Sequence, residues 1–149
     1  MTIKAEIEIA IARPAEAVWG QLMALERFPE WLTASGVTRV EREPVPLGAG
    51  TRLRIEQRIA GRSAVLEGIV TVWDPPRRLA FRATHPDGIT VDANAVVVPE
   101  GTASKLRWSL QVGLPLRLRL FESMAAPEVR RAVATDLMGL KRRLEAVAG

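Results

Sequence analysis

Few side chains in this sequence could carry acid–base or hydrogen-bonding chemistry inside a folded domain. The 149 residues include no cysteine, no tyrosine and a single histidine. This composition excludes disulfides, thiolate catalysis and a metal site built from several histidines or cysteines. The remaining polar candidates within predicted strands are two acids, Glu67 and Asp92, and two amides, Gln57 and Asn94; we expect Glu67 to point outward. We therefore expect no metal and no cofactor.

Gln57 interrupts an otherwise apolar alternation. One face of the predicted strand 51–59 carries Leu53, Ile55, Gln57 and Ile59, whereas the other face carries arginines and a glutamate. Burying an amide costs free energy unless the amide is hydrogen-bonded. Gln57 is therefore either a member of a polar network or a contact for a ligand.

Asp92 and Asn94 share one face of a strand that we predict over residues 89–98. The direction of that face is open, because both faces of this strand carry apolar residues. If the face points inward, Asp92 is the best candidate for a catalytic base, with a pKa raised by burial. If it points outward, both side chains are solvated.

Hydrophobic periodicity divides the chain into strands and helices. Helical patterns cover about 14–25 and 28–32, and a long one begins at Leu114, with Pro127 either kinking it or starting its main part. Short turns join the strands, so the sheet should be antiparallel. The length favours one domain over residues 1–149. The strand patterns cover seven stretches: 3–11, 37–43, 51–59, 63–73, 78–84, 89–98 and 104–112.

Composition narrows the class of protein further. Hydrophobic residues make up 48% of the chain and charged residues 26%, with a net charge of +4. The arginines alternate with glutamates, which is typical of a salt-bridged surface, and we expect no nucleic-acid partner. No apolar run approaches the roughly 20 residues that a membrane helix needs. The N-terminus alternates like a strand, unlike a signal peptide, so we expect a cytoplasmic location.

Three short motifs stand in a characteristic order. They are Arg13-Pro14-Ala15-Glu16-Ala17-Val18-Trp19, then Phe28-Pro29-Glu30-Trp31, then Trp73-Asp74-Pro75-Pro76-Arg77-Arg78-Leu79. With the long C-terminal helical pattern, they resemble the START/Bet v 1-like superfamily. Within it, the chain is most similar to the SRPBCC group of polyketide cyclases/dehydrases and lipid-transport proteins. The resemblance covers nearly the whole chain.

This resemblance implies an α+β helix-grip fold. In that fold a curved antiparallel sheet of about seven strands wraps around the long C-terminal helix, and two short helices follow the first strand. The curved sheet and the helix leave an apolar cavity between them. From the strand faces and the helix underside, we predict ligand-binding positions at Phe28, Trp31, Leu53, Ile55, Gln57, Phe81, Asn94, Trp108, Leu120 and Met124.

Two functions are compatible with such a cavity. The first is binding of a hydrophobic small molecule such as a lipid, an isoprenoid or a polyketide-like compound. The alternative is a polyketide cyclase or dehydratase that uses polar cavity residues as acid and base, with Asp92 the candidate. The resemblance implies that aromatase/cyclase members orient a polyketide with polar cavity residues that include tyrosine and arginine, and this chain lacks tyrosine. We expect the protein to be either a monomer or a homodimer.

Overall fold

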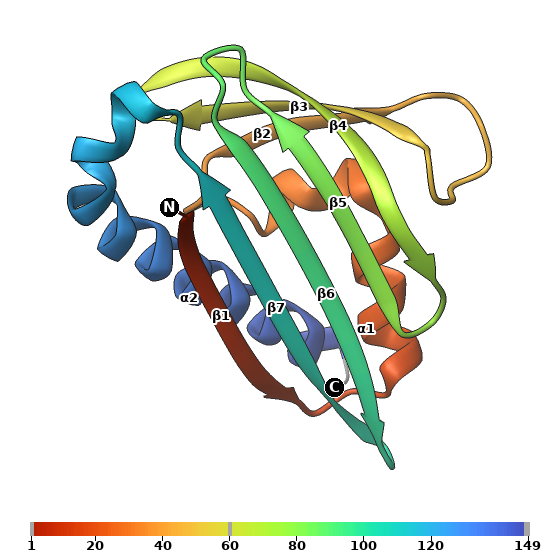
Figure 1. The fold of residues 1–149 in the computed structure, drawn as a ribbon. Helices are drawn as coiled ribbons and strands as arrows, with labels where there is room; N and C mark the ends of the chain where they lie inside the picture. The colour runs from red at the N-terminus through yellow and green to blue at the C-terminus, as the bar shows by residue number, and fades with distance from the viewer. Residues whose placement is uncertain (1, 60, 148–149) are drawn as a thin grey trace.

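The chain forms one antiparallel sheet, two helices and two short 3₁₀ segments (Figure 1). The computed structural model describes residues 2–59 and 61–147. The α+β helix-grip arrangement predicted from the sequence is confirmed. In chain order the elements are β1 Thr2–Ile11, α1 Ala15–Met23, η1 Leu25–Glu30, β2 Val37–Arg42, β3 Arg52–Ile59, β4 Arg62–Asp74, β5 Arg78–Thr84, β6 Thr90–Glu100, β7 Ala103–Gly113, η2 Leu116–Phe121 and α2 Glu122–Val147.

The sheet order is β1-β7-β6-β5-β4-β3-β2, with every neighbouring pair antiparallel. Consecutive strands from β2 to β7 are neighbours in the sheet, joined by a longer loop between β2 and β3 and by shorter connections after that, whereas β1 pairs with the last strand. The segment with α1 and η1 therefore has to connect the two edges of the sheet. In Figure 1 the sheet curves around α2, and its β2–β3 edge lies across from the start of that helix.

Alternation along the strands produces the buried inner face. On β1 the side chains of Ile3, Ala5, Ile9 and Ile11 are buried, while their neighbours are exposed. Along β4 the alternation changes phase, because the register shifts between Val70 and Val72. Gly68, just before this irregularity, allows close packing of the strands, since a Cβ there would lie 3.2 Å from that of Leu53.

Large side chains fill one end of the space between sheet and helices. Trp19 of α1 packs on Trp73 of β4, with ring centroids 5.3 Å apart. The C-terminal half of α2 contributes Leu137, Leu140 and Leu144, all buried. Pro127 lies inside α2, and the helical segment divides earlier, where η2 meets α2 at Glu122. No helix of the described residues is both long enough and apolar enough to cross a membrane.

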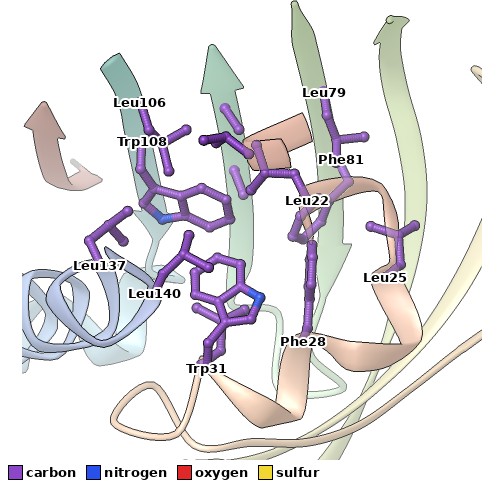
Figure 2. Close-up of a cluster of buried hydrophobic side chains, with 14 of the residues drawn as sticks. Leu22, Leu25, Phe28, Trp31, Leu79, Phe81, Leu106, Trp108, Leu137 and Leu140 are labelled. Carbon is purple, nitrogen blue, oxygen red and sulfur yellow. The ribbon is translucent and has the colours of Figure 1, made fainter. Parts of the chain in front are cut away.

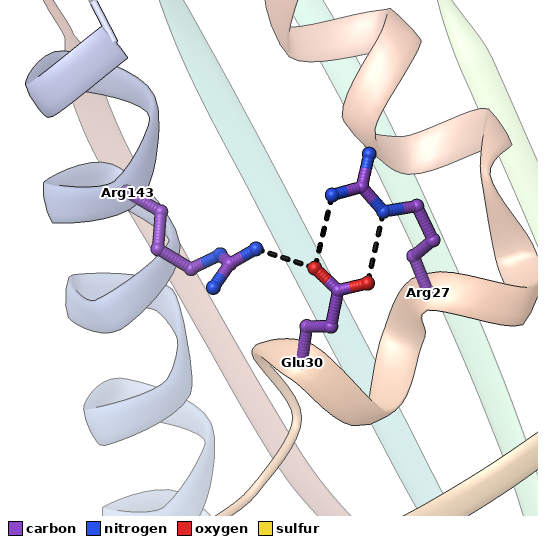
Figure 3. Close-up of polar contacts among 3 residues, drawn as sticks. All are labelled: Arg27, Glu30 and Arg143. Carbon is purple, nitrogen blue, oxygen red and sulfur yellow. Dashed lines mark hydrogen bonds and ion pairs between the residues drawn. The ribbon is translucent and has the colours of Figure 1, made fainter.

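A charged bridge on the surface joins η1 to α2. Glu30 accepts hydrogen bonds from Arg27 at 2.9 and 3.0 Å and from Arg143 of α2 at 2.6 Å (Figure 3). All three side chains are substantially exposed, so the bridge adds little to stability. Its effect is to define how the short segment sits against the helix.

Candidate functional site

An apolar cavity of about 470 Å³ lies between the inner face of the sheet and the N-terminal half of α2. Small side chains explain why the space stays open there. On the sheet the lining includes Ala83 and Ala93, and on the helix it includes Ala125 and Ala132. At the other end of α2 the equivalent face carries leucines, which fill the core. The position of the cavity therefore follows from where alanines replace larger residues.

Aromatic rings form one wall of the cavity. Phe28, Phe81 and Trp108 all line it. Trp31 stands behind this wall, edge-on to Trp108 with centroids 5.5 Å apart and edge-on to Phe28 at 5.4 Å (Figure 2). Its indole nitrogen is buried without a hydrogen-bond partner among the described residues. The Phe28-Pro29-Glu30-Trp31 motif thus builds the boundary between the cavity and the filled core.

A polar group closes the end of the cavity near the loop after η1. Ala34, Ser35 and Gln57 belong to its lining. The side-chain Nε2 of Gln57 donates a 2.7 Å hydrogen bond to the carbonyl oxygen of Ser35. Behind this loop, Asp136 of α2 accepts hydrogen bonds from the backbone N–H of Ala34 at 2.8 Å, the N–H of Ser35 at 2.9 Å and the Ser35 hydroxyl at 2.6 Å. A hydrogen-bonded chain therefore runs from helix to loop to sheet.

Asp136 is the one buried acid among the residues that the structure describes, with only 2% of its surface exposed. Burial raises the pKa of its carboxyl above the ordinary value of 3.8, and the hydrogen bonds from Ser35 and Ala34 act in the opposite direction. No arginine or lysine among the described residues forms an ion pair with it. Hydrogen bonds from the loop are what compensate for its burial.

The structure brings several predicted residues together at the cavity and leaves others in the core behind it. Trp31 and Leu53 are buried, at 2% and 3% exposure, but they do not reach the cavity surface. Leu53 packs instead beside Gly68 on the neighbouring strand. Those at the cavity surface are Phe28, Ile55, Gln57, Phe81 and Trp108.

Asp92 and Asn94 lie on the outer face of the sheet. The inner face of β6 is formed by the opposite parity, with Ala93 buried and lining the cavity. Asp92 is half exposed, and its carboxylate oxygen Oδ1 lies 3.7 Å from Nε of Arg82, the residue opposite it on β5. Asn94 accepts a 2.8 Å hydrogen bond from Arg78. The inward alternative for this face, which would have made Asp92 a cavity base, is therefore not the one that the fold adopts.

Leu120 and Met124 also lie outside the cavity, contrary to the prediction that they form the helix underside. They are 88% and 72% exposed. The 3₁₀ geometry of η2 and the later start of α2 rotate the inward positions to Leu118, Phe121 and Ala125, which do line the cavity. The error came from extending one α-helical period across residues that form two different helices.

Sequence reasoning missed Asp136 altogether. It follows Val133 by three positions and precedes Leu140 by four, so it lies on the buried stripe of α2. An acid at such a position is a recognisable signal, because burying it requires hydrogen-bond donors from another element. Among residues 2–59 and 61–147, no three histidine, aspartate or glutamate side chains are grouped closely enough to hold a metal ion.

Comparison with known proteins decides the family. The family model described as polyketide cyclase / dehydrase and lipid transport matches residues 2–145. The chain belongs to this family. The predicted SRPBCC resemblance is thereby confirmed. No curated protein matches the sequence significantly.

Several solved structures share the fold over nearly their full length. A Thermus thermophilus protein is 23% identical with a TM-score of 0.76, covering 98% of this chain and 99% of that one. The Zhui aromatase/cyclase from a Streptomyces species is 16% identical with a TM-score of 0.81, covering 100% and 97%. A START superfamily protein from Mycobacterium smegmatis is 19% identical with a TM-score of 0.68, covering 96% and 94%. At these identities the similarity establishes the fold alone.

Proposed function

We propose that this protein binds a hydrophobic small molecule, such as a lipid, an isoprenoid or a polyketide-like compound, in the cavity between sheet and α2. The observation that carries the proposal is the cavity of about 470 Å³ with its almost wholly apolar lining. Sites for small molecules have this size and character. The family description, which includes lipid transport and polyketide cyclisation, supports the same assignment.

The gain on binding comes from two sources. Apolar surface of the ligand leaves water, which contributes about 25 cal/mol per Å². In addition, cavity side chains such as Trp108 and Phe81 acquire packing partners that an open space denies them. Both terms favour a rigid apolar skeleton over a polar or charged molecule.

The experiment is a titration with N-phenyl-1-naphthylamine, a neutral apolar fluorophore whose emission rises when it leaves water. Native mass spectrometry of the purified protein, with and without added lipid extract, looks for a retained ligand. We expect saturable one-site binding that is weakened at least about tenfold in Ala132→Phe, because the added ring fills the cavity.

Thr135→Phe is the matched control, since Thr135 lies on the exposed side of the same helix. It adds the same ring without entering the cavity, and binding should stay within about twofold of the wild type. Equal weakening in both variants, or no saturable binding of any apolar ligand, would contradict the proposal.

The alternative, a polyketide cyclase or dehydratase, has weaker support. The family description and the similarity in fold to an aromatase/cyclase are compatible with it. However, its main candidate base, Asp92, lies on the outer face beside Arg82. A cyclase would have to use the amide of Gln57 or other groups at the cavity, so binding without turnover is the function that we favour.

A binding protein of this kind would act in the cytoplasm as a monomer or a homodimer and would carry its ligand between other proteins or membranes. Light scattering after size-exclusion chromatography determines the number of subunits. Fractionation of cells that produce the protein determines its location. Recovery of the protein with the membrane fraction would contradict the cytoplasmic assignment.

A further inference from the structure

The cavity has a direction, because its uncharged polar side chains gather at one end. Ser35 and Gln57 stand beside Arg58, where the loop after η1 meets β3. The rest of the lining is aliphatic and aromatic apart from Glu128 of α2, whose largely exposed side chain pairs with Arg131. An amphiphilic ligand would therefore have one preferred orientation. What the polar end accepts depends on which atom of the Gln57 amide faces the ligand.

Hydrogen bonding determines that atom. A backbone carbonyl can only accept, so the amide of Gln57 must present its NH₂ group to Ser35, as the 2.7 Å bond requires. The side-chain oxygen then lies on the other arm of the same planar group. No described residue donates a hydrogen bond to that oxygen, and it is not fully covered by protein atoms. The polar end thus offers an acceptor.

The orientation of the Ser35 carbonyl is itself held from both sides. On the helix side, the carboxylate of Asp136 accepts hydrogen bonds from the N–H and the hydroxyl of Ser35. On the sheet side, the carbonyl of Gly36 accepts a 2.8 Å hydrogen bond from the N–H of Arg58. Gly36 has a positive φ of 81° and packs so closely on Arg58 that a Cβ would lie 2.3 Å from its carbonyl oxygen. The loop therefore cannot rotate without breaking contacts with α2 or with β3.

We propose that the side-chain oxygen of Gln57 accepts a hydrogen bond from a hydroxyl group of the ligand, so that the cavity selects apolar alcohols or phenols over hydrocarbons of the same shape. Ser35 and Asp136 are positioning residues that hold the amide in this orientation. Asp136 lies behind the loop and does not touch the ligand. The inference rests on the proposed binding function and adds the chemical class of the ligand to it.

The test uses three probes of one shape: phenanthrene, 9-phenanthrol and 9-methoxyphenanthrene. The first has no polar group, the second can donate a hydrogen bond, and the third can only accept one. Quenching of tryptophan fluorescence measures their dissociation constants, since Trp108 lines the cavity. Each affinity is compared with that for the Gln57→Met variant, which has a similar shape and no amide. This comparison removes differences in how well water dissolves the probes.

We expect the preference for 9-phenanthrol over phenanthrene to be about tenfold greater in the wild type than in Gln57→Met, the size of one good hydrogen bond. The methoxy compound should show no such preference. Asp136→Asn should reduce the preference while leaving the affinity for phenanthrene unchanged, which a merely structural defect would not do. Asp92→Asn on the outer face is the control and should change neither value.

The outcomes separate this inference from the function beneath it. Saturable binding of all three probes with no hydroxyl preference would overturn the inference and leave the binding function standing. A methoxy preference equal to that for the hydroxyl would show that Gln57 donates instead of accepting, and would overturn the ligand class. If neither these probes nor N-phenyl-1-naphthylamine bind, both the inference and the proposed function are wrong.

Discussion

The hydroxyl of Ser35 donates a 2.6 Å hydrogen bond to the carboxylate of Asp136, a residue 101 positions later in the chain. Ser35 belongs to the loop that closes one end of the cavity, and Asp136 belongs to the buried stripe of α2. This contact ties the position of the helix to the shape of the cavity. A ligand that moves the loop would therefore act on α2 as well.

Removing the Asp136 carboxylate should destabilise the protein markedly. Asp136→Ala leaves the backbone N–H groups of Ala34 and Ser35 without their acceptor. We expect the free energy of unfolding to fall by about 3 kcal/mol in urea titrations. Glu128→Ala is the control on the same helix, because Glu128 is exposed and pairs only with Arg131, and it should cost about 0.5 kcal/mol or less. Equal losses in the two variants would contradict this role.

Stability should depend on pH through Asp136 in a definite direction. Because burial raises its pKa in the folded state, the folded protein holds the proton more tightly than the unfolded chain. Its contribution to stability is therefore greatest below the ordinary pKa of 3.8 and decreases as the pH rises through the raised pKa. The measurement is the unfolding free energy of the wild type minus that of Asp136→Asn, which should become smaller as the pH rises from about 4 to 7.

Other acids do not obscure this difference. Hydrogen bonds from Arg107, Arg27 and Lys141 lower the pKa values of Glu8, Glu30 and Glu145 below the ordinary 4.5. These glutamates stabilise the fold above that pH and lose their effect as the pH falls, which is the opposite sign. They are present in both proteins, so their contributions cancel. A difference that is constant or grows with pH would show that the pKa of Asp136 is not raised.

Gly36 should tolerate no side chain. Its φ of 81° is strained for other residues, and a Cβ would lie 2.3 Å from the carbonyl oxygen of Arg58. We expect Gly36→Ala to cost about 3 kcal/mol or more. Gly101→Ala isolates the backbone effect, because Gly101 has a φ of 65° and open space around it, and should cost about 1 kcal/mol. If the two variants lose the same stability, the close approach to Arg58 is not limiting.

Asp92 should be dispensable for ligand binding. Its side chain lies on the outer face of the sheet, half exposed and 3.7 Å from that of Arg82. Asp92→Ala should change the unfolding free energy by about 0.5 kcal/mol or less. Its dissociation constant for N-phenyl-1-naphthylamine should stay within about twofold of the wild type. A large loss of binding would mean that the outer face takes part in recognition after all.

The periodicity of the sequence was sufficient to predict the order of strands and helices, and the resemblance carried by the three motifs implied the helix-grip fold. Alternation in segments such as 3–11 and 51–59 located each strand to within a few residues, and short turns implied antiparallel pairing. Within the cavity, the parity of β3 correctly turned Ile55 and Gln57 inward, because that strand has one polar and one apolar face. Where a strand or helix has a single clear pattern, its own residues decide which side is buried.

Prediction failed where the local pattern was ambiguous or changed period. Both faces of β6 carry apolar residues, and only its pairing decided the matter: Asp92 stands between Arg82 of β5 and Gln111 of β7, on their shared outer face. Likewise, Leu120 and Met124 followed an α-helical period that the 3₁₀ segment η2 does not keep. In both cases a neighbouring element determines the direction of the side chain.

The sequence by itself determined the family, the order of the elements and the apolar character of the interior, because each depends on residues close together in the chain. Only the tertiary structure decided where the interior stays open and what closes it. The cavity depends on alanines of the sheet facing alanines of α2, and its polar end depends on Asp136 reaching Ser35. Such pairings join residues far apart in the chain, and packing and hydrogen bonding across that separation are established only when the chain folds.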